Sequence, residues 1–407
     1  MIKVILSRRM LVSFIMGFAC GLPLLLTSTL LQAWMKDKGV DLTSIGLMAL
    51  VGLPYTLKFL WAPFFDRYTI LFMGRRRGWL LVAQIALVIS IAGLGFTDPV
   101  RNPAIMVLAA VLVTFFSASQ DIVVDAYRRE DLADEELGLG SSFYINGYRV
   151  GMLLASGGGL ILADYLPFAM VYLIMAACML PGIVTSLLTP EPVVLAGTPK
   201  TLRDAVVEPL AEYFSRENAV LILAFVLLYK IGDTMASAIT TPFYLDIGFS
   251  KTEIGAVVKL FGFWATVAGS LTGGVLMLRI GINRSLWIFG LLQAVSTAGF
   301  AILARIGHSM PTLSGVIAFE NLTAGMGTAA YAAFMASLTN RKFTATQYAL
   351  LSSLMGVPRV LASAPTGFLA KHMGWESFFL FCVGIAVPGM MLLLKFAPWT
   401  PKSMRKV

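Results

Sequence analysis

Two aspartates, Asp121 and Asp125, lie four residues apart in a long apolar run, a spacing that places both on one face of a helix. Two carboxyl groups this close in a medium of low dielectric constant resist ionising together, so one of them can hold and release a proton. Asp125 also lies one turn before Arg128 and Arg129, and pairing with these basic residues is the competing interpretation. The pattern predicts proton transfer by this pair, without saying which aspartate carries the proton.

Further ionisable residues interrupt other apolar runs. A charge at the centre of a bilayer costs at least about 2.5–3.5 kcal/mol, so each of them is a candidate functional group. Lys230 and Asp233 are three residues apart and can pair with each other, whereas Glu320 stands alone in the middle of its run. We expect Asp233 and Glu320 to contribute to proton coupling. Lys58 suits either binding of an anion or pairing between helices, and Lys230 suits either binding or a purely structural pair with Asp233.

Arg149 and Arg359 lie about 210 residues apart, the spacing of a weak internal repeat described below. Arginine pairs with carboxylates through two parallel hydrogen bonds, so the two residues suit binding of a carboxylate-bearing substrate. They suit a symmetric structural clamp equally well. Tyr55 is one of several aromatic residues that can stack on a sugar, although most tyrosines in membrane helices serve in packing or as interface anchors.

The elements that carry these residues must cross a membrane. Of 407 residues, 58% are hydrophobic and only 13% are charged, and the mean hydropathy is +0.81. A soluble domain carries about a quarter charged residues, so this chain needs lipid as its solvent. The net charge of +9 does not indicate nucleic-acid binding, because the basic residues lie in short loops between apolar runs.

Twelve apolar runs are each long enough to cross roughly 30 Å of hydrocarbon as a helix. With the N-terminus inside, the inner segments hold about 19 Lys and Arg and the outer loops about 6, which predicts that both termini are cytoplasmic. The runs cover roughly residues 10–33, 43–65, 78–96, 103–127, 138–163, 168–189, 218–243, 252–278, 285–304, 311–337, 346–370 and 375–397.

The chain divides into two halves of six helices. We expect an N-terminal bundle over 1–189, a cytoplasmic linker over 190–217, a C-terminal bundle over 218–397 and a cytoplasmic tail over 398–407. The halves repeat weakly: Ile45-Gly46 recurs as Ile254-Gly255, Gln84 as Gln293, and Gly147-Tyr148-Arg149-Val150 as Val357-Pro358-Arg359-Val360. Two six-helix repeats around a central site resemble the plan of the major facilitator superfamily, in which the first, fourth, seventh and tenth helices line the cavity.

The loop between the second and third runs resembles a signature of the same superfamily. Its residues are Asp66-Arg67 followed by Gly74-Arg75-Arg76-Arg77. The resemblance implies a structural role, in which an acidic helix end and a basic loop hold the inner gate. The expected gate residues are therefore Asp66, Arg67, Gly74, Arg75 and Arg76.

A closer resemblance is to the AmpG-type muropeptide permeases, of the peptide/acetyl-CoA transporter family. It extends over nearly the whole chain. The motifs that carry it in the first half are Gly21-Leu22-Pro23-Leu24, Leu31-Gln32-Ala33-Trp34-Met35, Lys58-Phe59-Leu60-Trp61-Ala62-Pro63 and Ser117-Ala118-Ser119-Gln120-Asp121-Ile122-Val123. Those in the second half are Leu228-Tyr229-Lys230-Ile231-Gly232-Asp233, Phe319-Glu320-Asn321, Gly325-Met326-Gly327-Thr328 and Phe343-Thr344-Ala345-Thr346-Gln347.

The resemblance implies import of anhydromuropeptides (GlcNAc-anhydroMurNAc peptides) from periplasm to cytoplasm across the bacterial inner membrane. Transport would be driven by proton symport and would serve cell-wall recycling and β-lactamase induction. Such a large, anionic substrate needs basic, amide and aromatic partners. The expected binding residues are Tyr55, Lys58, Gln120, Asn146, Arg149, Lys230, Asn321 and Arg359. Some longer relatives add two C-terminal helices, and we expect transport without them.

Other functions fit the sequence less well. An enzyme needs a nucleophile with its base, a metal cluster or a phosphate loop, and none of these patterns is present, so we expect no catalysis, metal or cofactor. Carriers of this kind mostly act as monomers, and we expect the same here. The remaining alternatives keep the fold and change the cargo: a carrier of another amphiphilic anion, of the acyl-CoA type, or an exporter.

Overall fold

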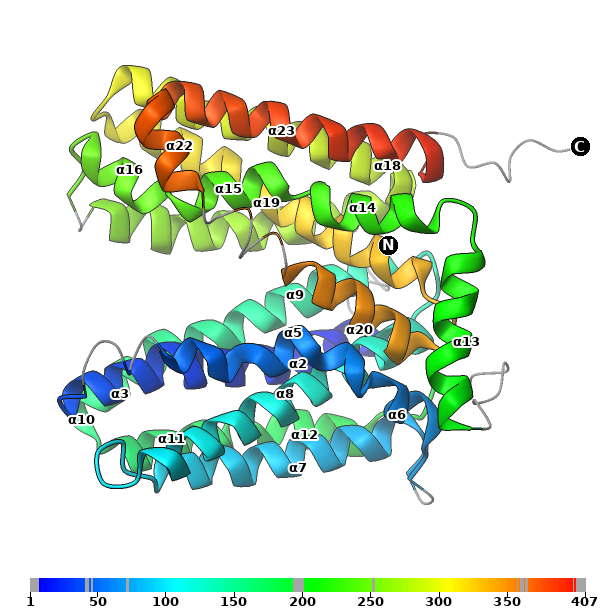
Figure 1. Cartoon of the computed structure of the whole chain (residues 1–407). Coiled ribbons are helices and arrows are strands. Elements are labelled where there is room, and N and C mark those ends of the chain that lie inside the picture. The colour runs from blue at the N-terminus through cyan, green and yellow to red at the C-terminus, as the bar shows by residue number, and fades with distance from the viewer. Residues whose placement is uncertain are drawn as a thin grey trace, which may run out of the picture. The chain divides into compact units, whose positions relative to one another are not determined.

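The structure is a computed structural model that describes residues 7–40, 44, 47–70, 73–192, 201–250, 253–356, 358, 362, 365–397 and 399. Helices follow one another along the described chain, and their order is shown in Figure 1. The extended backbone among these residues amounts to one bridge, between Ile70 and Gly74. The chain is therefore all-α in the part that the structure describes.

The helices of the first half match the six apolar runs predicted there, and most of these runs are built from several helical pieces. The pieces are α2 (Arg8–Leu25), η1 (Leu26–Leu30) and α3 (Leu31–Asp37); η2 (Met48–Gly52), α5 (Leu53–Leu57), η3 (Lys58–Leu60) and α6 (Ala62–Arg67); α7 (Arg76–Gly95); α8 (Pro103–Asp131); α9 (Leu137–Leu153), η4 (Leu154–Gly158) and α10 (Gly159–Tyr165); and α11 (Phe168–Ala177) and α12 (Leu180–Leu188).

The second half follows the helix α13 (Leu202–Ser215), which lies in the predicted linker. Its elements are α14 (Ala219–Leu228), α15 (Ile231–Ala238) and α16 (Thr240–Asp246); η5 (Ile254–Phe261) and α18 (Gly262–Ile306); α19 (Met310–Leu338); α20 (Thr344–Leu354) and α22 (Thr366–Met373); and α23 (Trp375–Phe396). α18 contains two of the predicted runs. The backbone kinks between them at Gly281, where φ is 79°. A residue with a side chain rarely adopts that φ.

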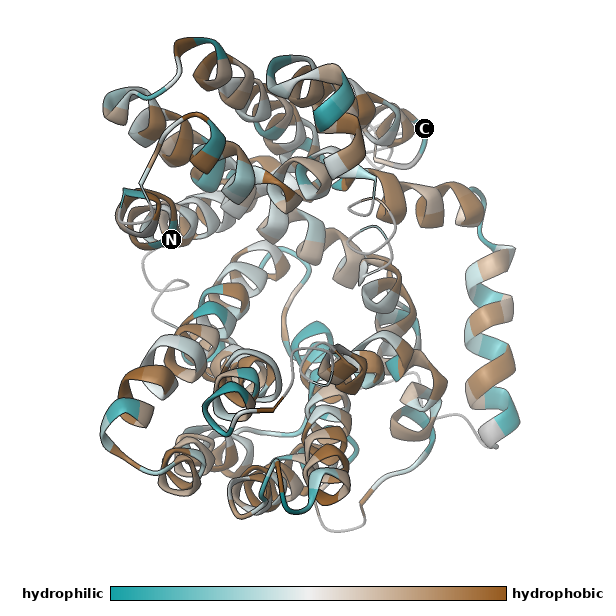
Figure 2. Ribbon diagram, turned by 60° about the vertical axis from the view of Figure 1, so that its left-hand side comes forward, coloured by the Kyte–Doolittle hydropathy of each residue, from teal (hydrophilic) through white to brown (hydrophobic). Residues whose placement is uncertain are grey.

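Seven continuous helices in the described part of the chain are long and apolar enough to cross a membrane. Figure 2 shows hydrophobic residues along the length of most helical ribbons. The shorter pieces arise where the helix tightens, widens or bends: η2 and η3 are 3₁₀-helical, whereas η1, η4 and η5 are π-helical. Such local changes of pitch inside a helix are frequent at functional sites.

The chain forms two compact units. Unit 1 comprises Met1–Asp134, Phe143–Leu210 and Leu338–Ser353, and unit 2 comprises Glu135–Ser142, Ala211–Ser337 and Leu354–Val407. Each unit has its own apolar core. That of unit 1 gathers around Leu22, Ile91 and Tyr172, and that of unit 2 around Phe243, Phe300 and Phe379. The division at 190–217 that the sequence predicts stays a prediction.

Glycines allow two helices of unit 1 to touch. A Cβ atom added at Gly17 or Gly21 of α2 would lie 2.0 Å from the backbone oxygen of Tyr144 or Tyr148, respectively, on α9. Since contact between such atoms needs more than 3 Å, only glycine fits at these positions. Close backbone approach at small residues is the usual way in which helices associate in lipid, where the hydrophobic effect does not drive them together. These contacts fix α9 beside α2, and with it the polar residues that α9 carries.

Candidate functional site

Asp121 lies on α8 and is buried, with 6% of its surface exposed. Its Oδ1 atom has no hydrogen-bond partner among the described residues. Lys58, buried on η3, lies within electrostatic range of Asp121 and forms no direct ion pair with it. A buried carboxyl oxygen without a partner is costly, and such groups in native proteins usually await water, a proton or a ligand. Asp121 therefore has the surroundings of a functional carboxyl group.

Asp125 is one turn further along α8 and has a partner. Its Oδ1 atom accepts a hydrogen bond of 3.1 Å from Arg128. Arg128 is buried as well, donates to the Tyr348 hydroxyl at 3.0 Å and lies over the ring of Tyr144 at 4.8 Å. The geometry thus favours the structural interpretation for Asp125 and separates the two aspartates that the sequence could not separate.

Two more of the expected binding residues, Gln120 and Tyr55, lie near Asp121 in unit 1. Gln120 is fully buried, donates to the Cys20 sulfur at 3.4 Å, and has an Oε1 atom without a described partner. The buried hydroxyl of Tyr55 on α5 is also without one. Asn146 on α9 is buried, with 3% of its surface exposed. The structure therefore collects unsatisfied hydrogen-bonding groups from α5 and α8 near one carboxyl group.

Arg149 on α9 is half-buried and has no ion-pair partner among the described residues. A guanidinium group that is removed from water without a carboxylate is unfavourable unless something else neutralises it. This arrangement suits an anionic ligand better than a structural clamp. Arg359, its predicted counterpart, lies outside the described residues.

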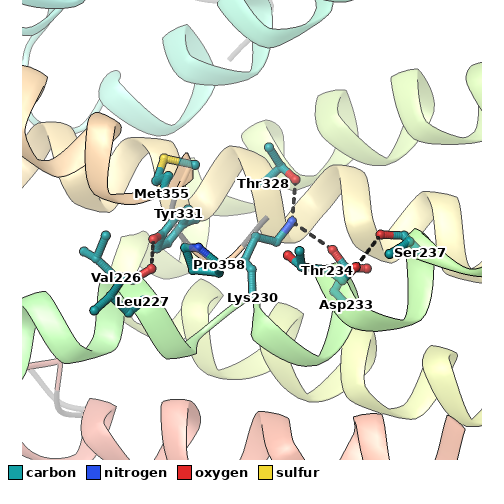
Figure 3. A pocket seen from close by; sticks show the side chains of 11 residues that line it. Val226, Leu227, Lys230, Asp233, Thr234, Ser237, Thr328, Tyr331, Met355 and Pro358 are labelled. Atoms are coloured by element: carbon teal, nitrogen blue, oxygen red, sulfur yellow. Dashed lines mark hydrogen bonds and ion pairs between the residues drawn. The ribbon is translucent and has the colours of Figure 1, made fainter. Parts of the chain in front are cut away.

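Unit 2 contains a cavity of about 410 Å³ that α14, α15 and α19 line (Figure 3). Lys230 stands at the N-cap of α15, and its ammonium group donates to Thr328 Oγ1 at 2.7 Å and faces Asp233 Oδ2 at 3.6 Å. Both charged side chains are about one-fifth exposed. The cavity wall is thus polar at Lys230 and Asp233 and apolar at Val226, Leu227 and Pro358, which suits an amphiphilic ligand.

Glu320 lies on α19, behind this cavity wall, and is buried with 8% of its surface exposed. Its Oε2 atom is 2.5 Å from the Ser296 hydroxyl of α18. Glu320 also lies within electrostatic range of Asp233. Two carboxyl groups this close in a medium of low dielectric constant resist ionising together. The pair Asp233–Glu320 is therefore able to hold one proton between a cavity-lining group and a buried group.

Asn321, the neighbour of Glu320, has a partner at each end of its amide. It donates to the Ile317 backbone oxygen at 3.0 Å and accepts from the Thr266 hydroxyl at 2.8 Å. The bond with Thr266 joins α18 to α19. The structure therefore gives Asn321 a packing contact, and its expected role in binding stays a prediction.

The expected inner-gate residues form a buried network in unit 1. Arg76 is fully buried and donates to Asp66 Oδ1 at 2.8 Å, to Glu130 Oε1 at 2.6 Å and to the Phe65 backbone oxygen at 3.0 Å. Arg75 adds a bond of 2.9 Å to Glu130. Arg67 is less involved and contacts the ring of Tyr68, with its guanidinium carbon 5.3 Å from the ring centre.

Asp66 also caps the first turn of α20. Its carboxylate accepts from the backbone N–H groups of Ala345 and Thr346 at 3.3 and 2.8 Å, and from the Thr346 hydroxyl at 2.7 Å. An anion at a helix N-terminus satisfies free N–H groups and opposes the positive end of the helix dipole. Gly74 has φ of 84° and leaves room for Glu191, which accepts from the N–H of Arg76 at 2.7 Å.

Sequence reasoning missed several members of these clusters. Glu130 follows two arginines that were counted only as basic loop residues, and Glu191 lies in the segment assigned to the linker. An acidic residue at a predicted helix end beside a basic loop was the available signal for both. Thr346 and Ser296 gave no signal, because a hydroxyl residue in an apolar run most often packs or bonds to its own helix. No group of three His, Cys, Asp or Glu residues that could hold a metal ion occurs in the described ranges.

Comparison with known proteins places the chain in a family. The sequence profile of the Major Facilitator Superfamily matches residues 10–245 and 226–406. The anhydromuropeptide permease of Escherichia coli (strain K12) is 46% identical over 395 residues, which cover 97% of this chain and 80% of that protein. A putative transporter, AmpG 4, of Rickettsia conorii is 32% identical over 403 residues, with 96% of this chain and 97% of that protein covered.

Solved structures agree on the fold. The human organic anion transporter MFSD10 has a TM-score of 0.70 at 18% identity, over 95% of this chain and 99% of that one. The proton:xylose symporter XylE has a TM-score of 0.72 at 12% identity, over 96% of this chain and 95% of that one. The chain is thus a multi-pass membrane carrier and not an enzyme. It belongs to the major facilitator superfamily and, within it, to the family of the anhydromuropeptide permeases.

Proposed function

We propose that this protein imports anhydromuropeptides from the periplasm into the cytoplasm by proton symport. The observation that carries the proposal is the 46% identity to a permease named for that substrate, which extends over 97% of the chain. The substrate is an amphiphilic anion, with two sugar rings and a peptide that ends in carboxylates. The buried cations and unsatisfied polar groups of the two units match this chemistry.

The substrate-binding role falls first to Lys230 and Arg149. Lys230 presents a charge on the wall of the unit 2 cavity, where Thr328 and Asp233 hold its ammonium group. Arg149 has no acidic partner among the described residues of unit 1. Arg149 offers a peptide carboxylate a positive group without an acidic partner, and Lys230 offers one whose charge is shared with Asp233. Gln120 and Tyr55 have hydrogen-bonding atoms without a partner among the described residues, which suit the hydroxyl and amide groups of the sugars.

The proton-coupling role in unit 1 falls to Asp121. Asp125 is held by Arg128 at 3.1 Å, whereas Asp121 has an oxygen without a described partner. We expect Asp121→Asn to abolish accumulation driven by a proton gradient and to preserve the folded protein. Asp125→Asn is the matched control: it should lower stability more than it lowers coupling. Normal accumulation by Asp121→Asn at wild-type expression would refute this assignment.

The orientation that supports import has both termini in the cytoplasm of a bacterial inner membrane. The excess of Lys and Arg in the inner segments supports it. Protons that enter with an anion offset its charge against an inside-negative potential, which makes uptake favourable. One chain carries both the cations and the carboxyl groups, so we propose that the monomer is the working unit.

A competition assay distinguishes this cargo from the alternatives. Uptake of labelled GlcNAc-anhydroMurNAc tripeptide into proteoliposomes is measured with an excess of unlabelled muropeptide, free tripeptide, disaccharide or acyl-CoA. We expect only the complete muropeptide to compete strongly, because the proposed partners recognise sugar and carboxylate together. Stronger competition by acyl-CoA would identify a carrier of another amphiphilic anion. Muropeptide movement only out of the vesicles would indicate an exporter.

A further inference from the structure

Ser296 on α18 lies within hydrogen-bonding distance of three oxygen atoms and can donate to only one of them at a time. Its Oγ atom lies 2.5 Å from Glu320 Oε2, 2.8 Å from the backbone oxygen of Gln293 and 2.9 Å from Thr323 Oγ1. Thr323 Oγ1 in turn lies 3.0 Å from the backbone oxygen of Glu320. Ser296 and Thr323 are each only 1% exposed, so water does not supply the missing donors from bulk solvent.

Each protonation state of Glu320 has a consistent arrangement of these hydrogens. Each hydroxyl has one hydrogen to donate, and the four contacts together offer four acceptors. When Glu320 is ionised, Ser296 donates to its Oε2 and Thr323 donates to Ser296 Oγ. When Glu320 carries a proton, its O–H donates to Ser296 Oγ, Ser296 turns to the Gln293 oxygen, and Thr323 turns to the Glu320 backbone oxygen. Both arrangements use the same atoms at the same distances.

We propose that Ser296 and Thr323 are positioning residues that hold Glu320 in place in both its protonated and its ionised form, so that Glu320 can exchange one proton with Asp233 during transport. The inference rests on the proposed proton coupling and assigns a role to two residues outside it. No bond within either hydroxyl breaks. The proton leaves Glu320 for the Asp233 carboxylate, and the two hydroxyl hydrogens only change acceptor.

The surroundings of Glu320 give the proton a route to solvent. Asp233, on α15, lies within electrostatic range of Glu320 and lines the cavity of unit 2. Lys230 faces this pair, 3.6 Å from Asp233, and Tyr244 of α16 is another titratable group in electrostatic range of Glu320. A proton on Asp233 is therefore in contact with the cavity, whereas the hydroxyl pair keeps Glu320 satisfied after the proton has left.

The test compares variants of one residue with a neighbour of the same kind. Ser296→Ala and Thr323→Val remove the hydroxyls, Ser296→Thr restores one, and Thr297→Val is the matched control. Thr297 is equally buried and bonds to the same Gln293 oxygen at 3.1 Å, without a contact to Glu320. Uptake of labelled muropeptide is measured against external pH, and substrate exchange is measured without a gradient. Glu320→Gln, which resembles the protonated form, is the reference.

We expect Ser296→Ala to move the midpoint of the pH profile upward by about one unit, because the ionised carboxyl group loses a strong donor. The rate of substrate exchange without a gradient should stay within about twofold of the wild-type rate, since no substrate contact changes. Ser296→Thr should restore the wild-type midpoint. Thr323→Val should shift it in the same direction by less. A midpoint unchanged in Ser296→Ala, or moved as much by Thr297→Val, would overturn the proposal.

Infrared difference spectroscopy gives a second readout that needs no transport. Titration of the purified protein shows the C=O stretching band of the protonated carboxyl group, which Glu320→Gln identifies by removing it. Ser296→Ala should raise its frequency, since the acid loses the acceptor of its hydrogen bond, and Thr297→Val should not. If the wild type shows no proton-driven uptake while the band shifts as expected, the proposed function fails and the hydroxyl pair stands. An unshifted band refutes the pair itself.

Discussion

Replacement of Arg76 by methionine should destabilise the protein more than the same replacement at either neighbouring arginine. Arg76 is fully buried between Asp66 and Glu130, so its loss strands the facing oxygens of two carboxylates together with the Phe65 carbonyl. Breaking a buried ion pair from one side costs about 3–5 kcal/mol. Asp66 keeps its bonds to α20 and Glu130 keeps Arg75, so we expect a loss near the lower end, roughly 3 kcal/mol.

The arginine triplet supplies its own controls. Arg75 makes one short bond to Glu130, and a hydrogen bond to a charged group contributes about 1.5–3 kcal/mol. Arg77 is half-buried and donates to the backbone oxygens of Ser186 and Leu187 at 3.1 and 2.6 Å. These bonds join a charged group to neutral acceptors near solvent, so we expect them to contribute about 1 kcal/mol. From the most to the least stable, the predicted order of the variants is Arg77→Met, Arg75→Met and Arg76→Met.

The chain contains a reporter for this measurement. Cys20 and Cys382 are buried free thiols, with 0% and 1% of their surface exposed. A fluorogenic thiol reagent added to protein in detergent labels them as the helices separate, so thermal scans follow unfolding without an added label. If Arg76→Met melts no lower than Arg77→Met, the network does not stabilise the fold and the reasoning from burial is wrong.

Three further predictions follow from other parts of the structure. Gly21→Ala should lower the melting temperature, because its Cβ would lie 2.0 Å from the Tyr148 oxygen. Gly93→Ala is the control and should not lower it, because the space around Gly93 is open. Equal effects of the two substitutions would contradict the proposed helix contact. Lys230→Met should raise KM for muropeptide at least about tenfold, because a hydrogen bond from a charged group is lost. Lys230→Arg keeps a charged donor and should raise KM less. An unchanged KM in Lys230→Met would leave Lys230 a purely structural partner of Asp233. Glu253 accepts hydrogen bonds from the backbone N–H and the hydroxyl of Ser250, and these bonds, with the His308 ring, hold the pKa of Glu253 below its ordinary value. The ionised Glu253 therefore stabilises this loop above about pH 4.5, and the stabilisation is lost as the pH falls through the lowered pKa. Glu253→Gln should therefore weaken hydrogen-exchange protection of the Ser250 amide at about pH 6. The variant and the wild type should converge as the pH falls through the lowered pKa of Glu253, and a difference that stays constant on acidification would contradict this.

The positions of the long helices could be predicted from the sequence because each is one uninterrupted apolar run. The predictions 103–127 and 311–337 compare with Pro103–Asp131 and Met310–Leu338 in the structure. The π-helical turns could not be predicted, since one extra residue in a turn leaves hydropathy unchanged and blurs only the periodicity. The kink of α18 at Gly281 is a backbone angle that a glycine permits and does not require.

The candidate residues were predictable as types, and their partners were not. An ionisable residue in an apolar run is conspicuous in any sequence, so Asp121, Lys230 and Glu320 were all identified. Their neighbours lie far along the chain: Asp66 meets Thr346 across 280 residues, a distance over which no local pattern carries information. The same limit hid Ser296, which becomes conspicuous only when its distances to Glu320 and Gln293 are known.

The most direct test of the account is uptake by the purified wild-type protein. It is reconstituted in liposomes, and entry of labelled GlcNAc-anhydroMurNAc tripeptide is followed with and without an imposed inward proton gradient. Because anion and protons are proposed to move together, the account predicts accumulation that rises with the gradient and collapses when an uncoupler is added. Equal uptake with and without the gradient would contradict proton symport and remove the role proposed for Asp121 and Glu320. Correctly inserted protein that moves no muropeptide at all would contradict the assigned cargo.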